Sequence, residues 1–158
     1  MKTKSTTAVL HDIRSAQNVG AIFRTADAAG ISKIYLTGYT PTPIDRFGRA
    51  RKDIAKASLG AELSIPWEQV INTKELLLRL KKENFKIVAI EQAPSSTDYK
   101  DIKINTPTAF VLGNEVEGIS KDILSICDTV AEIPMAGSKE SLNVSVAFGI
   151  AVFRMLGR

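Results

Sequence analysis

The sequence predicts a single α/β domain, built on a parallel β-sheet that helices cover on both faces. Two runs, 86–91 (KIVAIE) and 108–112 (TAFVL), are almost wholly apolar, which is typical of strands buried on both faces. Stretches with apolar residues at helical spacing lie between the strand-like runs. No repeat, linker or low-complexity segment divides the 158 residues. We therefore expect one domain over 1–158.

The N-terminal half alternates strand and helix patterns. A β-rich run at 7–13 precedes a helical pattern, for which Asn18 is the expected N-cap and Gly30 the expected stop. A strand is expected at 32–37, and two prolines exclude regular structure from much of 38–48. The next expected elements are a basic helix (49–59), a strand (61–66) and an amphipathic helix (73–84).

The C-terminal half continues this alternation and ends in an apolar helix. Pro134 and Gly137 interrupt the chain before that helix, and Ser141 is its expected N-cap. Because the helix is so apolar, we expect it to lie in the core. The expected elements are strand 86–91, polar loop 92–100, strand 108–112, helix 120–127, strand 129–135 and helix 142–156.

Composition excludes several classes of protein. A chain that is 44% hydrophobic and 24% charged is ordinary for a soluble globular protein. It has one cysteine (Cys127) and one histidine (His11), which excludes an internal disulfide and a Cys/His zinc cage, and we expect no metal. No membrane span and no signal peptide is recognisable, so we expect a cytoplasmic protein without a membrane partner. We interpret His11 as a hydrogen-bonded histidine of the sheet rather than a catalytic base.

The net charge of +4 is unevenly distributed. Segment 45–58 carries five basic and two acidic residues, whereas 110–135 carries five acidic residues and one lysine. A basic patch beside an acidic pocket suits a polyanionic partner and a cationic small ligand. Ordinary solvated faces are the alternative.

Three polar loops follow strands of the predicted sheet, and ligands of such sheets bind beyond the carboxyl ends of the strands. Gly113, Gly118 and Gly137 would let the backbone approach a ligand closely. Polar residues at the start of an apolar helix, including Ser141 and Asn143, either cap the helix or face a ligand. The loops begin at Glu91, at Gly113 and at Pro134.

Two common nucleotide-binding motifs do not fit. No G-x-G-x-x-G follows the first strand, so a dinucleotide-binding fold lacks its fingerprint. Gly113 and Gly118 have P-loop spacing, but Ile119 stands where the phosphate-binding lysine belongs and Lys121 comes two positions late. A protein that uses this loop for phosphate remains an alternative, and it predicts affinity for ATP.

Three stretches together resemble the motifs of the TrmH/SpoU branch of the SPOUT RNA methyltransferases. They are NVGAIFRTADAAG from Asn18, FVLGNEVEGIS from Phe110 and IPMAGSKESLNVSVA from Ile133. The segment RKDIAKASLGAE between the first two is also similar to the family, and the likeness covers most of 7–156.

This resemblance implies a homodimer whose C-terminal part forms a deep trefoil knot. General topology rules predict against a knot, since threaded chains are rare. The implied reaction transfers a methyl group from S-adenosyl-L-methionine to a ribose 2′-hydroxyl of RNA and leaves S-adenosylhomocysteine. The implied non-catalytic alternative is an RNA-binding protein that keeps the same fold.

The resemblance also implies a cofactor site in the loops. Apolar residues there suit a flat adenine, and the carboxylate of Glu115 suits the positive sulfonium. Related enzymes often have threonine at the position of Ile90, so one polar contact is missing here. The implied cofactor-binding residues are Ile90, Leu112, Gly113, Ile133, Met135 and Leu142.

The motifs assign catalytic roles to Asn18, Arg24, Glu115, Ser141 and Asn143. Arg24 is expected to clamp a phosphate near the target ribose, because a guanidinium pairs with phosphate through two hydrogen bonds. Glu115 is expected to fix the loop or the ribose rather than act as an acid. Asn143 is expected to tie the start of the last helix to that loop.

RNA contacts are expected on the basic segment, with Phe47 and Tyr39 as candidates for base stacking. We expect no separate RNA-binding domain, and tRNA as the substrate, with ribosomal RNA as the alternative. The retained Arg24, Glu115 and Asn143 favour an enzyme over a non-catalytic relative. The expected phosphate-binding residues are Arg46, Arg49, Arg51 and Lys52.

Overall fold

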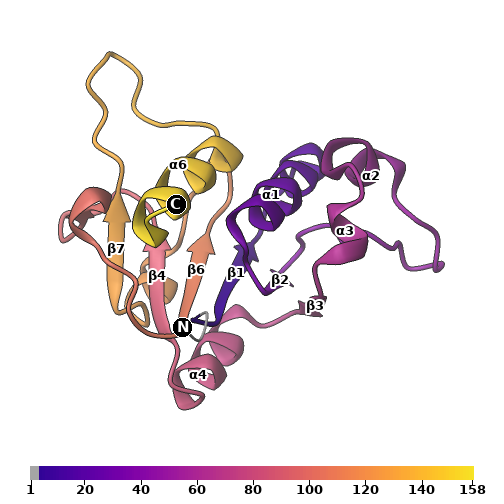
Figure 1. Cartoon of the computed structure of the whole chain (residues 1–158), viewed down its shortest axis with the longest axis horizontal. Helices are drawn as coiled ribbons and strands as arrows, with labels where there is room; N and C mark the ends of the chain where they lie inside the picture. Colours follow the sequence, from indigo (N-terminus) through magenta and orange to yellow (C-terminus); the bar gives the residue numbers. More distant parts are fainter. Residues whose placement is uncertain (1–3) are drawn as a thin grey trace.

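The computed structural model describes residues 4–158, so residues 1–3 of the expected domain lie outside the described residues. Its centre is a seven-stranded sheet in the order β3-β2-β1-β6-β4-β7-β5 (Figure 1). Every strand pair is parallel, which confirms the predicted sheet. The strands are β1 Thr6–His11, β2 Lys33–Thr37, β3 Trp67–Val70, β4 Lys86–Ile90, β5 Thr97–Asp98, β6 Thr108–Leu112 and β7 Thr129–Glu132.

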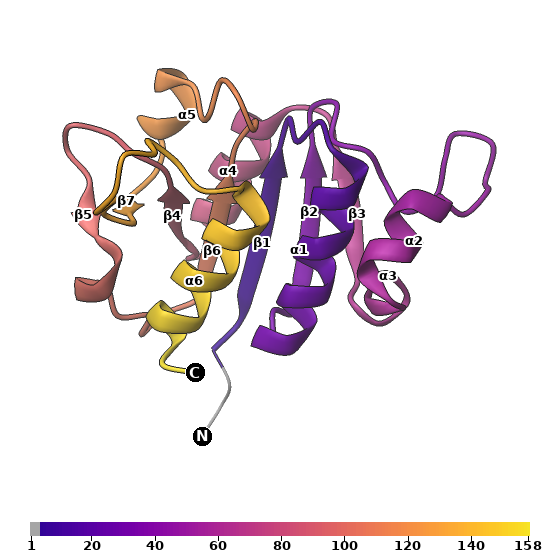
Figure 2. The same cartoon turned by 90° about the horizontal axis from the view of Figure 1, so that it is seen from above.

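Helices cover both faces of the sheet. The long helices α1 and α6 pack side by side on one face, with α2 and α3 at the end of that layer, whereas α4 and α5 lie on the other face (Figure 2). The helices are α1 Ala16–Ala29, α2 Lys52–Ser58, α3 Ala61–Ser64, α4 Thr73–Lys82, the 3-10 helix η1 Tyr99–Asp101, α5 Lys121–Leu124 and α6 Val144–Leu156.

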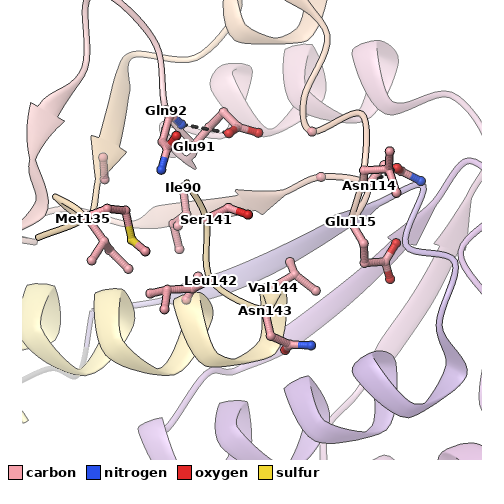
Figure 3. Close-up of a pocket in the computed structure, with 16 residues that line it drawn as sticks. Ile90, Glu91, Gln92, Asn114, Glu115, Met135, Ser141, Leu142, Asn143 and Val144 are labelled. Atoms are coloured by element: carbon pink, nitrogen blue, oxygen red, sulfur yellow. Dashed lines mark hydrogen bonds between the residues drawn. The ribbon is translucent and has the colours of Figure 1, made fainter. Parts of the chain in front are cut away.

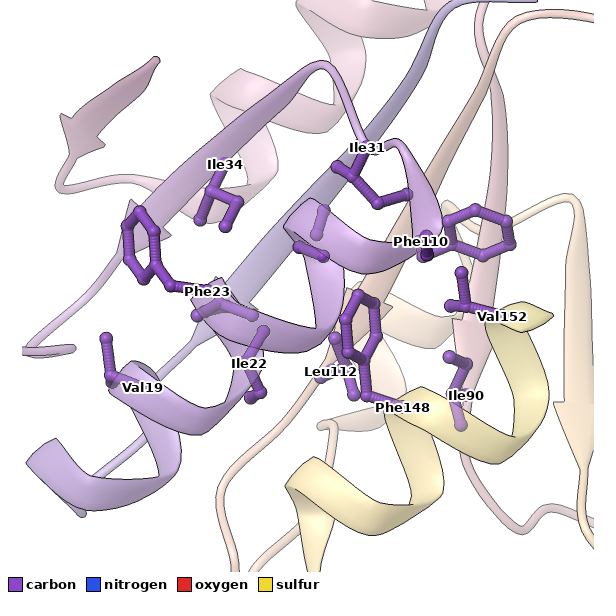
Figure 4. Packing of buried hydrophobic residues seen from close by; sticks show 14 of the residues in the cluster. Val19, Ile22, Phe23, Ile31, Ile34, Ile90, Phe110, Leu112, Phe148 and Val152 are labelled. Atoms are coloured by element: carbon purple, nitrogen blue, oxygen red, sulfur yellow. The ribbon is translucent and has the colours of Figure 1, made fainter. Parts of the chain in front are cut away.

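Successive strand residues supply two separate cores. In β6, Phe110 and Leu112 belong to the cluster under α1 and α6, while Ala109 and Val111 belong to the cluster under α4. Figure 4 shows Phe148 of α6 directed toward α1 and β6. Burial on both faces is the reason that these strands are apolar without alternation.

The expected strand at 61–66 is wrong. Leu59 and Gly60 both adopt left-handed backbone conformations, which end α2 and start a new turn in which Ala61 is buried. The strand of this region, β3, begins at Trp67 and pairs with β2. The expected polar loop at 92–100 also contains a short strand, since Thr97 pairs with Ala131 of β7.

Two expected N-caps are wrong, although Gly30 does end α1 as predicted. Ser15 caps α1 by accepting a hydrogen bond from the amide of Asn18 at 3.1 Å, so Asn18 is already helical. Asn143, rather than Ser141, caps α6, because it directly precedes the first helical residue and its Oδ1 accepts from the amides of Ser145 and Val146.

The last helix is not core all round. Phe148 and Val152 are fully buried, but Val146 and Ile150 are exposed on the opposite side. Throughout residues 4–158, no helix is both long and apolar enough to span a membrane.

Candidate functional site

A cavity of about 210 Å³ opens where β4, β6 and β7 end (Figure 3). The loops that follow these strands and the start of α6 line it, with Met135 and Leu142 on one side and Asn114 and Glu115 on the other. The structure places five of the six expected cofactor-binding residues in the lining: Ile90, Gly113, Ile133, Met135 and Leu142. The sixth, Leu112, does not line the cavity, because its side chain is buried in the core under α1 and α6.

Several lining residues were predicted only as parts of the polar loops and were given no role of their own, among them Glu91, Gln92 and Asn114. Gln92 donates its side-chain amide to the carbonyl of Glu140 at 2.7 Å and so joins the loop after β4 to the segment before α6. Glu91 accepts from the amide of Ile119 at 3.0 Å. Their position after buried strands identified the loops, but nothing in the sequence showed which side chains of those loops face the cavity.

Gly113 is required because the loop at 113–118 folds back on itself. A Cβ at Gly113 would lie 2.6 Å from the backbone carbon of Gly118 and 2.5 Å from the side chain of Ile119. Ile119 is buried in the core under α4. Therefore the two glycines at P-loop spacing form a closed turn, and a buried isoleucine stands where a phosphate-binding lysine would be needed.

Asn114 holds this turn in shape from a buried position. Its side-chain oxygen accepts from the amides of Val116 and Glu117 at 2.9 and 2.8 Å. Its side-chain nitrogen donates to the carbonyl of Asp12 and to the hydroxyl of Tyr39, at 3.0 and 2.8 Å. All the principal bonding groups of this amide are occupied, so the turn is fixed against the ends of β1 and β2.

Glu115, Asn18 and Asn143 form one hydrogen-bonded network. The Glu115 carboxylate accepts from the amides of Arg14 and Ser15, at 3.0 and 3.1 Å, and from the side-chain nitrogen of Asn18 at 3.1 Å. The side-chain nitrogen of Asn143 donates to the Asn18 side-chain oxygen at 3.1 Å. Three of the five expected catalytic residues, on α1, on the loop after β6 and at the start of α6, therefore meet at the mouth of the cavity.

These donors decide the charge of Glu115. Burial pushes the pKa of this carboxyl upward, but the hydrogen bonds from Arg14, Ser15 and Asn18 together outweigh burial, and the pKa is lowered. Glu115 is thus a stably ionised acceptor at neutral pH. An ionised carboxylate with several donors suits an anchor of the loop and does not suit a general acid.

Ser141 and Arg24 stand apart from this network. Ser141 lines the cavity, whereas Arg24 is exposed on α1 and does not line it. Within residues 4–158, Arg24 makes no hydrogen bond or ion pair that would hold its guanidinium. Its side chain is consequently available for a ligand that reaches the cavity from outside.

The expected phosphate-binding residues lie on the loop before α2 and at the start of that helix. Arg46, Arg49 and Lys52 are exposed, while Arg51 is half-buried and stands at the N-cap position of α2. The guanidinium of Arg51 pairs with Asp53 at 2.8 Å, and Arg49 pairs with Asp45 at 3.3 Å. The four cations therefore differ in the charge that they can offer to a phosphate, since ion pairs within the chain partly neutralise two of them.

His11 is hydrogen-bonded within the protein, as the sequence predicted. Its Nδ1 lies 2.7 Å from the Thr73 hydroxyl, and its Nε2 lies 3.5 Å from the Asp12 carboxylate. Burial lowers the pKa of His11, and the negative charge of Asp12 opposes this without reversing it. The imidazole is therefore neutral at pH 7.

A lowered pKa of His11 predicts a loss of stability in mild acid. As the pH falls through the ordinary histidine value of about 6.5, the unfolded chain binds a proton before the folded one does, so the free energy of unfolding decreases. We expect this decrease to be smaller in His11→Asn. Urea unfolding of both proteins between about pH 7.5 and 5 measures how the free energy of unfolding depends on pH. An equal dependence in the two proteins would contradict the lowered pKa of His11.

Known proteins are similar to this chain in sequence and in fold. Residues 5–153 match the model of the SpoU rRNA Methylase family. A TrmH-family relative from Staphylococcus haemolyticus is 33% identical over 96% of this chain, which spans 58% of the relative. A tRNA (guanosine(18)-2'-O)-methyltransferase of Aquifex aeolicus is 34% identical over 90% of this chain and 64% of the relative.

A solved structure of a known protein has a similar fold. The AdoMet-bound rRNA methyltransferase of Sinorhizobium meliloti superposes with a TM-score of 0.85 and 33% identity, over 96% of this chain and 55% of that one. The fold and site define an α/β domain with a cavity at the carboxyl edge of a parallel sheet, where ligands of such sheets bind. The chain belongs to the SpoU rRNA Methylase family, which confirms the resemblance seen in its three motifs.

Proposed function

We propose that this protein methylates a ribose 2′-hydroxyl of RNA with S-adenosyl-L-methionine as the methyl donor. The observation that carries the proposal is the network of Glu115, Asn18 and Asn143, which joins all three sequence motifs at the mouth of one cavity. The names of the relatives support it, since they include a tRNA 2'-O-methyltransferase and an AdoMet-bound rRNA methyltransferase.

The cavity fits this cofactor chemically. Ile90, Ile133 and Leu142 offer apolar side chains for a flat purine, and the loops place backbone groups beside them. The carboxylates of Glu91 and Glu115 also line the cavity and complement a positively charged sulfonium. S-adenosyl-L-methionine, when bound, supplies the methyl group, and S-adenosylhomocysteine is the product. The reaction that we propose uses no metal.

The chain's own residues position the RNA. Arg24 binds a phosphate next to the target ribose, because a guanidinium offers a planar pair of donors. It does not take the 2′-hydroxyl proton, since a guanidinium hardly deprotonates in proteins. Glu115 and Asn143 fix the loop and the helix start that face the ribose, and Ser141 offers a hydroxyl at the cavity wall. Alignment of the hydroxyl for in-line attack then supplies much of the rate.

The test is methyl transfer from labelled S-adenosyl-L-methionine to unmodified tRNA and to unmodified ribosomal RNA. We expect label in the tRNA, and label in the ribosomal RNA alone would select the second substrate. A protein that labels neither pool yet binds RNA would be the non-catalytic relative. ATP binding without binding of S-adenosylhomocysteine would instead identify a phosphate-binding loop and contradict the proposal.

We also propose a homodimer. Val146 and Ile150 lie about one turn apart on α6 and are 49% and 40% exposed, and Leu142, which precedes the helix, is 37% exposed. Residues four apart on a helix share a face, so Val146 and Ile150 form an exposed apolar strip near the cavity, which Leu142 lines, and a second copy of the chain would cover it. Arg24 lies outside the cavity lining, so a site completed across two protomers fits its proposed role.

We further propose the deep trefoil knot that the resemblance implies and a cytoplasmic location. The knot is supported by the path of the C-terminal segment. After β7 the chain crosses to the loop that follows β4, where Gln92 contacts Glu140, before α6 packs on α1 and β4.

Removing the basic charges should weaken RNA binding. We expect that replacing Arg49, Arg51 and Lys52 with alanine lowers affinity and reduces the slope of log K against log salt by about 0.7 for each phosphate that the variant no longer binds. Binding titrations at several salt concentrations measure the slope. The control replaces the exposed Lys82, Lys86 and Lys103 and should leave the slope unchanged. An unchanged slope in the first variant would place the RNA elsewhere.

A further inference from the structure

The loop at 43–51 presents an aromatic ring to solvent at its tip. Phe47 is 66% exposed, and in Figure 2 this loop projects beyond α2, away from the sheet. A large apolar side chain in such a position stabilises the fold little, because it buries little surface. The ring is therefore available to a partner.

The loop is held in one shape by its own hydrogen bonds. The Asp45 carboxylate accepts from the amides of Phe47 and Arg49, at 2.8 and 3.0 Å. The ends of the loop are closed by bonds from the amide of Arg51 to the carbonyl of Pro43 and from the amide of Asp45 to the carbonyl of Arg49. Gly48 has φ +76°, a conformation that favours glycine. The ring is consequently presented by an ordered turn.

Two guanidiniums accompany the ring. The Cζ atoms of Arg46 and Arg49 lie 4.8 and 5.0 Å from the centroid of Phe47, within the range of cation–π contacts. With the nearby exposed Lys52 the surroundings keep a net positive charge, although Asp45 partly neutralises Arg49. An aromatic face next to cations matches a nucleotide, which combines a flat base with a phosphate.

The connection from β2 to the loop at 43–51 is hydrogen-bonded, near its start, to the loop that lines the cavity. Tyr39, which begins the connection from β2 to the loop, is 58% exposed, and its hydroxyl accepts from the side chain of Asn114 at 2.8 Å. Asn114 in turn holds the loop that carries Glu115. A strand of RNA bound along this segment would thus run toward the proposed site of methyl transfer.

We propose that Phe47 stacks on an unpaired base of the RNA substrate, while Arg46 and Arg49 bind the adjoining phosphates. The base must be unpaired, because neighbouring base pairs cover both faces of a base in a duplex. Stacking on a phenyl ring tolerates every base, so the contact selects single-stranded segments rather than a sequence. The inference rests on the proposed function in so far as that function makes RNA the partner.

The experiment compares Phe47→Ala, Phe47→Leu and Phe47→Trp with the wild type. The probes are a fluorescent single-stranded RNA of about ten nucleotides and the same sequence in a duplex. We expect Phe47→Ala to weaken single-strand binding about tenfold and to leave duplex binding and the salt slope unchanged. Tryptophan should restore the affinity and leucine should not. The control Leu78→Ala removes another exposed apolar side chain, on α4, and should change nothing.

Three outcomes would overturn the inference: single-strand affinity that is unchanged in Phe47→Ala, an equal loss for both probes, or full rescue by leucine. Methyl transfer separates this inference from the proposed function. If the wild type transfers no methyl group, and Phe47→Ala binds the single-stranded RNA more weakly than the wild type does, the stacking role stands and the proposed enzyme does not. If transfer persists in Phe47→Ala with unchanged kcat and KM, the stacking role fails and the enzyme stands.

Discussion

Replacing Glu115 with glutamine is expected to slow methyl transfer about a hundredfold, through misplacement of the groups that face the ribose. Glutamine has nearly the same shape, but it replaces one carboxylate oxygen with an amide that donates. The Glu115 carboxylate accepts from the amides of Arg14 and Ser15, so a donating group there would face other donors. The loop at 113–118 and the start of α1 would lose their common anchor.

Single-turnover methyl transfer measures this effect. Glu117→Gln is the matched control, because Glu117 lies in the same loop and, within residues 4–158, its carboxylate makes no ion pair or hydrogen bond. We expect the control to retain the wild-type rate. A wild-type rate in Glu115→Gln would mean that the network is not needed for the reaction.

The lowered pKa of Glu115 gives the same variant a second readout, its dependence on pH. The carboxylate stabilises the folded state fully above its ordinary pKa, and this contribution is lost as the pH falls through the lowered folded value. The Glu115 contribution should therefore be constant from neutral to mildly acidic pH. In acid unfolding, the wild type should lose this contribution to the free energy of unfolding only at lower pH. Glu115→Gln should show no such loss.

The sheet could be predicted because its strands carry a simple signal. Residues buried on both faces must be apolar throughout, and runs such as 86–91 meet that condition with few alternatives. The helix at 61–64 could not be predicted in this way. It depends on left-handed backbone at Leu59, a residue type that seldom adopts this conformation, so local propensity pointed to a strand.

The sequence predicted which loops form the site. Polar residues after buried strands meet at one edge of a parallel sheet, and the cavity lies there. The partners within the site were not predictable, because the contact of Asn18 with Asn143 spans 125 residues. The same limit explains the misplaced caps. Ser15, Ser141 and Asn143 are all good capping residues, and only the backbone path decides which of them precedes the first helical turn.

Arg24→Ala is expected to reduce methyl transfer about a thousandfold while leaving binding of S-adenosyl-L-methionine intact. The two effects separate because Arg24 is exposed on α1 and does not line the cavity. A guanidinium that clamps the phosphate beside the target ribose contributes to alignment of the hydroxyl and not to the affinity for the methyl donor. Calorimetry of the donor and single-turnover transfer measure the two quantities independently.

Arg24→Lys distinguishes clamping from charge alone. Lysine keeps the positive charge but loses the planar pair of donors, so a clamp predicts that most of the activity stays lost, whereas simple attraction of RNA predicts recovery. Weaker donor binding in Arg24→Ala would instead place Arg24 at the cofactor cavity. Since this guanidinium lies outside the cavity lining, that result would require a second protomer, or a movement of α1, to bring it there.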